Sequence, residues 1–199
     1  PRHVEVLARL AREALEESDQ MRFAGGTGLA EVLIELHVVA ATARKAKDRA
    51  GALAALVEVS FVASRLSATL GDHGLALTAI RRGFDAAQAA ERPDLVGLMA
   101  MGRGLSLIRV GARRRAVLVV DQALAELDVL PVRSRDDDTR LLEARGMLHL
   151  ASAQLAARDG RAGDSVEHLA AARSLAAVTG ERDHMHYHFG PTNVAAWEL

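Results

Sequence analysis

Residues 64–83 read SRLSATLGDHGLALTAIRRG and place small residues at fixed distances around the glycine Gly71. Small residues lie seven positions before this glycine, five after it and twelve after it. Small residues also lie at these three offsets from Gly111 and from Gly160. Antiparallel helices need small residues where their backbones approach, because a larger side chain overpacks at a cost of about 1–3 kcal/mol. The pattern predicts three helical hairpins that turn near Gly71, Gly111 and Gly160. The nine small residues are Ser64, Ala76, Gly83, Gly104, Ala116, Ala123, Ala153, Ser165 and Ala172.

The composition extends this helical prediction to the whole chain. Half of the 199 residues are hydrophobic but only 3% are aromatic. Alanine and leucine supply most of the apolar content, and both favour helices over strands. We therefore expect an all-α fold with about nine helices. Their expected ranges are 4–15, 27–49, 53–70, 75–90, 95–110, 114–127, 139–157, 163–178 and a last helix after Gly190-Pro191. We expect the basic residues at 44–49 to lie at the C-terminal end of the second helix, where cations are favourable.

Charge and cysteine content exclude several classes of function. The net charge is −1, with 25 basic and 26 acidic residues, whereas a domain that grips nucleic acid on its own is usually clearly basic. The absence of cysteine excludes disulfides, thiolate metal sites and a cysteine nucleophile. We expect a cytoplasmic protein with no membrane partner, no cofactor and no enzymatic activity. The chain begins with Pro1, and we expect it to be part of something longer.

The hairpins are similar to the tetratricopeptide repeat, which stacks into a right-handed solenoid with a concave binding face. The turn glycines are 40 and 49 residues apart (111 − 71 and 160 − 111), compared with about 34 residues in that repeat. The resemblance implies one helical-repeat domain over residues 1–199.

A more specific resemblance comes from the segment His188-Phe189-Gly190-Pro191-Thr192-Asn193-Val194-Ala195. With the stretches at 70–76 and 35–37, it resembles a family of actinobacterial transcription regulators. These regulators carry an N-terminal helix-turn-helix domain of the phage-repressor type and a tetratricopeptide-like C-terminal sensor. The resemblance implies that the chain is the sensor half, with a DNA-binding domain before residue 1.

The first helix of each hairpin is expected to line the concave face. Residues thirteen, ten and six positions before each turn glycine share one helix face, and they form a mostly apolar trough with one charged end. Such a trough suits an amphipathic small molecule or a short peptide; the alternative is that these residues are ordinary core. The candidate residues are Glu58, Phe61, Arg65, Leu98, Met101, Leu105, Met147, Leu150 and Gln154, with Tyr187, Phe189 and Asn193 closing one end.

Three other motifs favour a structural interpretation. His184, His186 and His188 lack a third ligand on one helix face, so we expect no metal site. The glycines at 25–28 precede a helix but lack the lysine of a phosphate-binding loop, which favours a linker. Arg113-Arg114-Arg115 could contact an acidic partner or DNA, but such a run is more often a solvated turn.

Two functional hypotheses remain open. The first is a regulatory domain that senses a small molecule or peptide and forms a homodimer, with its DNA-reading heads outside this chain. The second is a stand-alone adaptor that binds a protein partner. The effector, the operator and the direction of regulation do not follow from the sequence.

Overall fold

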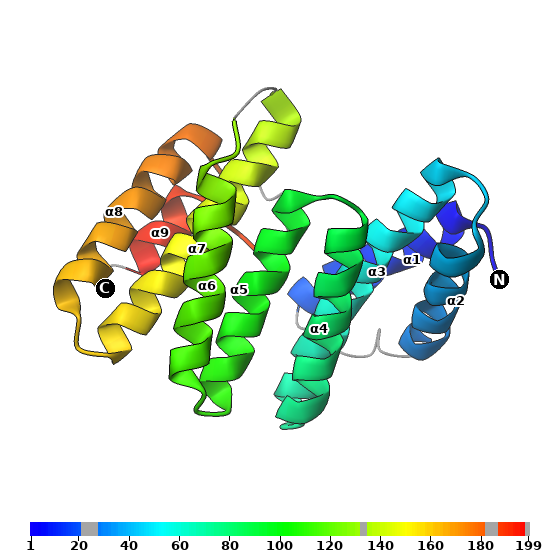
Figure 1. The fold of residues 1–199 in the computed structure, drawn as a ribbon, viewed down its shortest axis with the longest axis horizontal. Helices are drawn as coiled ribbons and strands as arrows, with labels where there is room; N and C mark the ends of the chain where they lie inside the picture. The colour runs from blue at the N-terminus through cyan, green and yellow to red at the C-terminus, as the bar shows by residue number, and fades with distance from the viewer. Residues whose placement is uncertain (21–27, 132–134, 182–186, 198–199) are drawn as a thin grey trace. The chain divides into compact units, whose positions relative to one another are not determined.

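The computed structural model describes residues 1–20, 28–131, 135–181 and 187–197, and these residues contain nine α-helices and no strand (Figure 1). The expected all-α fold and helix number are therefore confirmed for this part of the chain. The helices are α1 (Val4–Asp19), α2 (Leu29–Thr42), α3 (Ala46–Thr69), α4 (His73–Ala89), α5 (Pro93–Arg109), α6 (Arg113–Asp128), α7 (Arg135–Arg158), α8 (Ala162–Thr179) and α9 (Pro191–Ala196). The chain divides into two compact units, Pro1–Leu95 and Val96–Leu199, called unit 1 and unit 2 below.

Glycines with left-handed backbones make the tight turns after α3, α5 and α7. Gly71, Gly111 and Gly160 have φ values of 85°, 78° and 73°, in the region that glycine adopts without a steric penalty. After Gly71, the Asp72 side chain accepts a hydrogen bond from the Leu75 N–H (2.9 Å) and caps the start of α4. The structure thus places all three glycines at hairpin turns.

The boundary between α2 and α3 differs from the expectation. The predicted helix over 27–49 ends at Thr42, and a new helix begins at Ala46. Ala43 and Lys45 are extended, with ψ values of 125° and 128°. Neither glycine nor proline lies at this break, so the sequence gives no signal that one helix ends there and another begins. Lys47 and Arg49 therefore lie near the beginning of α3, and no basic residue lies in the last turn of α2, so the prediction that these cations stabilise the C-terminal end of the second helix is wrong.

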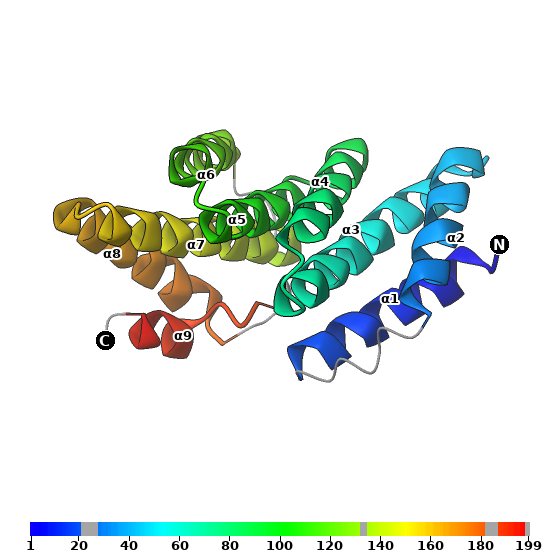
Figure 2. The ribbon, with the colours of Figure 1, turned by 90° about the horizontal axis from the view of Figure 1, so that it is seen from below.

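Helix α3 is the centre of unit 1. Helices α1, α2 and α4 all pack against it (Figure 2). Helix α1 contributes the buried stripe Leu7, Ala11 and Leu15, at the four-residue spacing that keeps side chains on one face of a helix. An ion pair between Arg65 on α3 and Asp19 at the end of α1 (Nη1–Oδ1 2.5 Å) fixes the C-terminal end of α1.

Close packing in unit 2 depends on small residues. A Cβ atom at Gly97 on α5 would lie 2.7 Å from Leu127 Cδ1 of α6 and 3.1 Å from Ala144 Cβ of α7. Of the nine small residues around the turn glycines in the two units, all but Ser165 are buried. Ser165 is half-buried, and its hydroxyl donates to the Ala153 carbonyl oxygen across the α7–α8 hairpin (3.0 Å).

Helix α9 lies beside α8, and a buried phenylalanine anchors the segment before it (Figure 2). The Phe189 ring is 2% exposed and packs on Gly146 of α7 so closely that a Cβ there would overlap three ring atoms. The Glu181 carboxylate accepts hydrogen bonds from the Thr192 N–H (2.8 Å) and hydroxyl (2.7 Å) at the first turn of α9. The Phe189–Gly146 contact and the two hydrogen bonds to Glu181 therefore hold this short helix in place.

Candidate functional site

The predicted trough residues of unit 1 are largely committed to internal contacts. Phe61 is 3% exposed. The Arg65 guanidinium lies 5.9 Å from the centroid of the Phe61 ring and also binds Asp19. Glu58 is half-buried on the same helix. The charged end of the predicted trough thus carries an arginine that already has a carboxylate partner.

The predicted trough residues of unit 2 divide into core residues and half-buried residues. The buried residues are Leu98, Met101, Met147, Leu150 and Phe189; the half-buried residues are Leu105, Gln154, Tyr187 and Asn193. The Gln154 Oε1 atom is buried and accepts no hydrogen bond from the described residues. The Asn193 side chain donates to the His188 carbonyl oxygen (2.8 Å) and accepts from Trp197 Nε1 (3.0 Å), so its amide stabilises the joint before α9. The trough as a ligand site stays a prediction.

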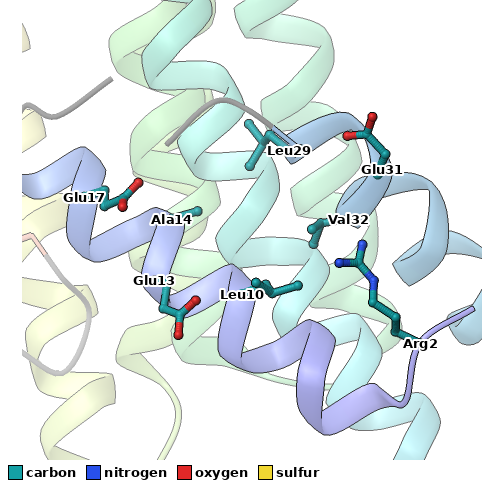
Figure 3. Close-up of a pocket in the computed structure, with 9 residues that line it drawn as sticks. Arg2, Leu10, Glu13, Ala14, Glu17, Leu29, Glu31 and Val32 are labelled. Carbon is teal, nitrogen blue, oxygen red and sulfur yellow. The ribbon is translucent and has the colours of Figure 1, made fainter. Parts of the chain in front are cut away.

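A cleft of about 380 Å³ lies between α1 and α2 in unit 1. This volume is at the lower end of the range found for small-molecule sites, about 300–1,000 Å³. Leu10 and Ala14 of α1 and Leu29 and Val32 of α2 form its apolar part, as Figure 3 shows. The cleft thus offers an apolar surface between two helices.

Carboxylates surround this apolar surface. Glu13 and Glu17 project from α1, and Glu31 projects from α2 (Figure 3). Within the described part of the chain, Glu13 pairs with Arg9 (2.6 Å), while Glu17 and Glu31 make no ion pair. The margin of the cleft is therefore acidic.

The single cation that lines the cleft among the described residues, Arg2, is already neutralised. Its Nη2 atom lies 2.6 Å from Glu35 Oε1, and its backbone N–H donates to Glu35 Oε2 (2.5 Å). These hydrogen bonds lower the pKa of the half-buried Glu35 carboxyl and raise the pKa of Arg2, which the nearby Glu31 carboxylate raises further. With Arg2 paired, Glu17 and Glu31 give the cleft its local negative charge.

A pair of histidines meets where α7 packs on α8. The Nδ1 atoms of His149 and His168 are 3.0 Å apart, and the ring centroids are 5.3 Å apart. Burial lowers the pKa of His149, and the neighbouring His168 lowers it further. A neutral pair can share one hydrogen between the two nitrogens.

The remaining sequence motifs lie partly outside the described residues. His184 and His186 and the glycines at 25–26 lie outside the described residues; Gly28 precedes α2 with a left-handed φ of 87°. Arg113, Arg114 and Arg115 are exposed at the start of α6. No group of three or more His, Asp or Glu among the described residues is arranged to bind a metal ion.

Helix α3 is the one described helix that is long and apolar enough to cross a membrane by length and composition. Most of its apolar window is buried inside the protein, which is also expected of the central helix of a compact unit.

Neither the cleft nor the histidine pair was predicted from the sequence. Glu13 and Glu17 are four residues apart and flank the apolar stripe of α1, a signal that could have marked one wall of the cleft. His149 and His168 lie eleven residues before and eight after the turn glycine Gly160 (160 − 149 and 168 − 160). Hairpin register could therefore have placed these two histidines near each other.

Comparison of the chain with models of known protein families, with curated proteins and with solved structures finds no match.

Proposed function

We propose that this chain is the non-catalytic sensor domain of a helix-turn-helix transcription regulator, and that a small cationic, amphipathic effector binds in the α1–α2 cleft. The observation that supports the effector site is the apolar cleft with Glu17 and Glu31 at its edge. The resemblance of residues 188–195 to actinobacterial regulators supports the regulatory role. A tetratricopeptide-like right-handed solenoid, a cytoplasmic location and a homodimer belong to the same proposal.

The chemistry of the cleft selects the kind of effector. An alkyl chain or aromatic ring would cover the half-buried Leu10 and Ala14, which contributes about 25 cal/mol for each Å² of apolar surface removed from water. An ammonium or guanidinium group at the margin would meet Glu17 and Glu31. A guanidinium also matches carboxylate geometry through two parallel hydrogen bonds. An anionic effector would meet like charges and bind poorly.

Effector binding would act through α1. The cleft is formed by α1 and α2. An effector that contacts both helices therefore stabilises the relative orientation of α1 and α2 to which it binds best. Helix α1 also contacts α3 through the Asp19–Arg65 ion pair, which transmits a shift of α1 to the centre of unit 1. In the regulator, we expect this shift to change how the dimer holds its DNA-reading heads.

Thermal unfolding with octylguanidinium as the probe tests the cleft. At about ten times its Kd, a ligand adds roughly 1.4 kcal/mol of stability, which corresponds to about 3–6 °C for a protein of this size. The double variant Glu17→Gln/Glu31→Gln should lose most of this shift. Glu167→Gln, an exposed position on α8, is the matched control and should keep it. Equal shifts in all three proteins would contradict the site.

The regulator assignment has a separate test. The native coding sequence ahead of Pro1 should encode a helix-turn-helix domain of about 60–70 residues, a size that folds independently. Gel-shift assays on the full-length protein should then show that octylguanidinium changes the affinity for operator DNA. A start codon directly before Pro1 would contradict the regulator assignment.

An adaptor for a protein partner is the second candidate, and the outer face of α2 favours it. Ile34 and Val38 lie four residues apart on this helix, with exposures of 64% and 42%. Exposed apolar neighbours of this kind are typical of interaction surfaces. If the adaptor function is correct, Ile34→Asp should abolish partner capture and leave octylguanidinium binding unchanged.

A further inference from the structure

A hydrogen bond between two histidine rings joins the helices of the α7–α8 hairpin. The Nδ1 atoms of His149 on α7 and His168 on α8 are 3.0 Å apart. Both side chains are half-buried, so the hairpin holds the rings in place while solvent protons still reach them. Such a hydrogen bond needs one nitrogen that carries a hydrogen and one that does not. The contact therefore depends on the protonation state of the pair.

The pair has three protonation states, and they differ in this contact. In the neutral pair, the Nδ1–H of one ring donates to the bare Nδ1 of the other. After one proton is added, the charged ring donates to the neutral ring, which gives a charge-assisted hydrogen bond. After a second proton is added, two N–H groups and two positive charges face each other across 3.0 Å. The contact thus tolerates one added proton but not two.

The surroundings of the pair also disfavour a second charge. Burial lowers the pKa of His149, and the neighbouring His168 lowers it further. Asp128 of α6 raises this pKa and Arg145 of α7 lowers it. The Arg145 guanidinium lies 3.7 Å from the Asp128 carboxylate, so these two charges largely offset each other. Helix α9, which packs on α8, carries no titratable side chain.

We propose that the hydrogen bond between His149 and His168 is a pH-sensitive latch of the α7–α8 hairpin, which is closed while the pair carries at most one added proton and is opened by a second. Opening removes a polar contact between the two helices. Because α9 packs on α8, loosening of α8 extends to α9. The latch lies in unit 2 and is independent of the α1–α2 cleft and of the proposed regulatory function.

The lowered pKa of His149 sets the direction of the pH effect on stability. The unfolded chain takes up a proton at this residue near the ordinary histidine pKa of about 6.5, whereas the folded chain takes it up only at lower pH. The stabilisation is therefore complete above about pH 6.5 and is lost as the pH falls from there towards the folded-state pKa. Over that interval the unfolding equilibrium constant should rise by up to about tenfold for each pH unit.

Urea unfolding of the 199-residue chain from about pH 8 to about pH 5, where histidine titrates, tests the latch. The double variant His149→Gln/His168→Gln has polar side chains that form hydrogen bonds but do not titrate, so we expect it to lose this part of the pH dependence. His73→Gln on α4, a half-buried histidine of unit 1, is the matched control and should keep the pH dependence of the parent. The same pH dependence in the double variant and in the parent would overturn the proposal.

A second measurement needs no substitution, so it decides the question even where the double variant does not fold. Nuclear magnetic resonance of the imidazole nitrogens of the parent should show that the two rings titrate in separate steps, as coupled groups do. The second step should coincide with faster amide hydrogen exchange around His149 and His168. One common step for both rings, or unchanged hydrogen exchange through the second step, would contradict the latch.

Discussion

Replacing Gly146 by alanine should destabilise unit 2, although alanine is the better helix former. A Cβ at this position would lie 2.6 Å from Phe189 Cε1 and closer still to Cζ and Cε2. Ordinary carbon–carbon contacts are about 3.5–4.0 Å long, so the ring would have to withdraw by about 1 Å or more. The ring is 2% exposed, and its neighbours leave it little room to move.

The expected magnitude is a balance of two effects. Overpacking in a close-packed core costs about 1–3 kcal/mol. Alanine in place of glycine inside a helix contributes about 1 kcal/mol in the opposite direction. The net free energy of unfolding should therefore fall by up to about 2 kcal/mol for Gly146→Ala.

A double-mutant cycle makes this test sharp. In a Phe189→Ala background the obstructing ring is gone, so Gly146→Ala should stabilise the protein by up to about 1 kcal/mol. Urea unfolding measures the global effect, and amide hydrogen exchange of Val194 reports local detachment of α9. Gly163→Ala on α8 is the control, because a Cβ there meets no atom within 4 Å. If Gly146→Ala stabilises the protein in both backgrounds, the argument from the Phe189 contact is refuted.

Three further predictions concern other contacts. Ala76→Leu and Ala123→Leu should each lower the free energy of unfolding by about 1–3 kcal/mol through overpacking, and unchanged melting temperatures would contradict the close helix approach. Arg145→Met should cost about 1.5–3 kcal/mol in urea unfolding, because the buried guanidinium donates to backbone carbonyls at the end of α6. Hydrogen bonds from Thr192 lower the pKa of Glu181, so this contact stabilises α9 above the unfolded-state pKa of that carboxyl. The contribution should disappear as the pH falls through the folded-state pKa. Nuclear magnetic resonance titration of the Thr192 amide should show this loss as a pH-dependent change of its signal. In Glu181→Gln this pH dependence should be absent.

Much of the fold could be predicted because its turns have a local cause. A glycine such as Gly71 ends a helix through its own left-handed backbone, and small residues at fixed offsets report the close approach of the two helices. The α2–α3 break could not be predicted in the same way. Ala43 and Lys45 are extended there, although neither residue type disfavours a helix.

The candidate sites could be predicted less well, because a binding surface depends on which helix faces remain uncovered. Helical spacing placed Met101 and Met147 in a trough, and Phe189 was expected to close one end of it, but the structure buries all three side chains. The cleft arises from the angle at which α1 meets α2, and sequence periodicity carries no information on that angle. The sequence does contain one further signal of close helix packing. Gly97 and Gly146 both lie fourteen residues before a turn glycine (111 − 97 and 160 − 146), and both admit a close neighbour.

The contact between Gly146 and Phe189 also restricts the order in which these two positions can change during evolution. A single nucleotide converts a glycine codon into an alanine codon, so Gly146→Ala arises readily. While Phe189 remains, that change costs stability, but once position 189 carries a smaller side chain the same change becomes favourable. Related sequences should therefore show a larger residue at position 146 only in lineages that first lost the phenylalanine at position 189.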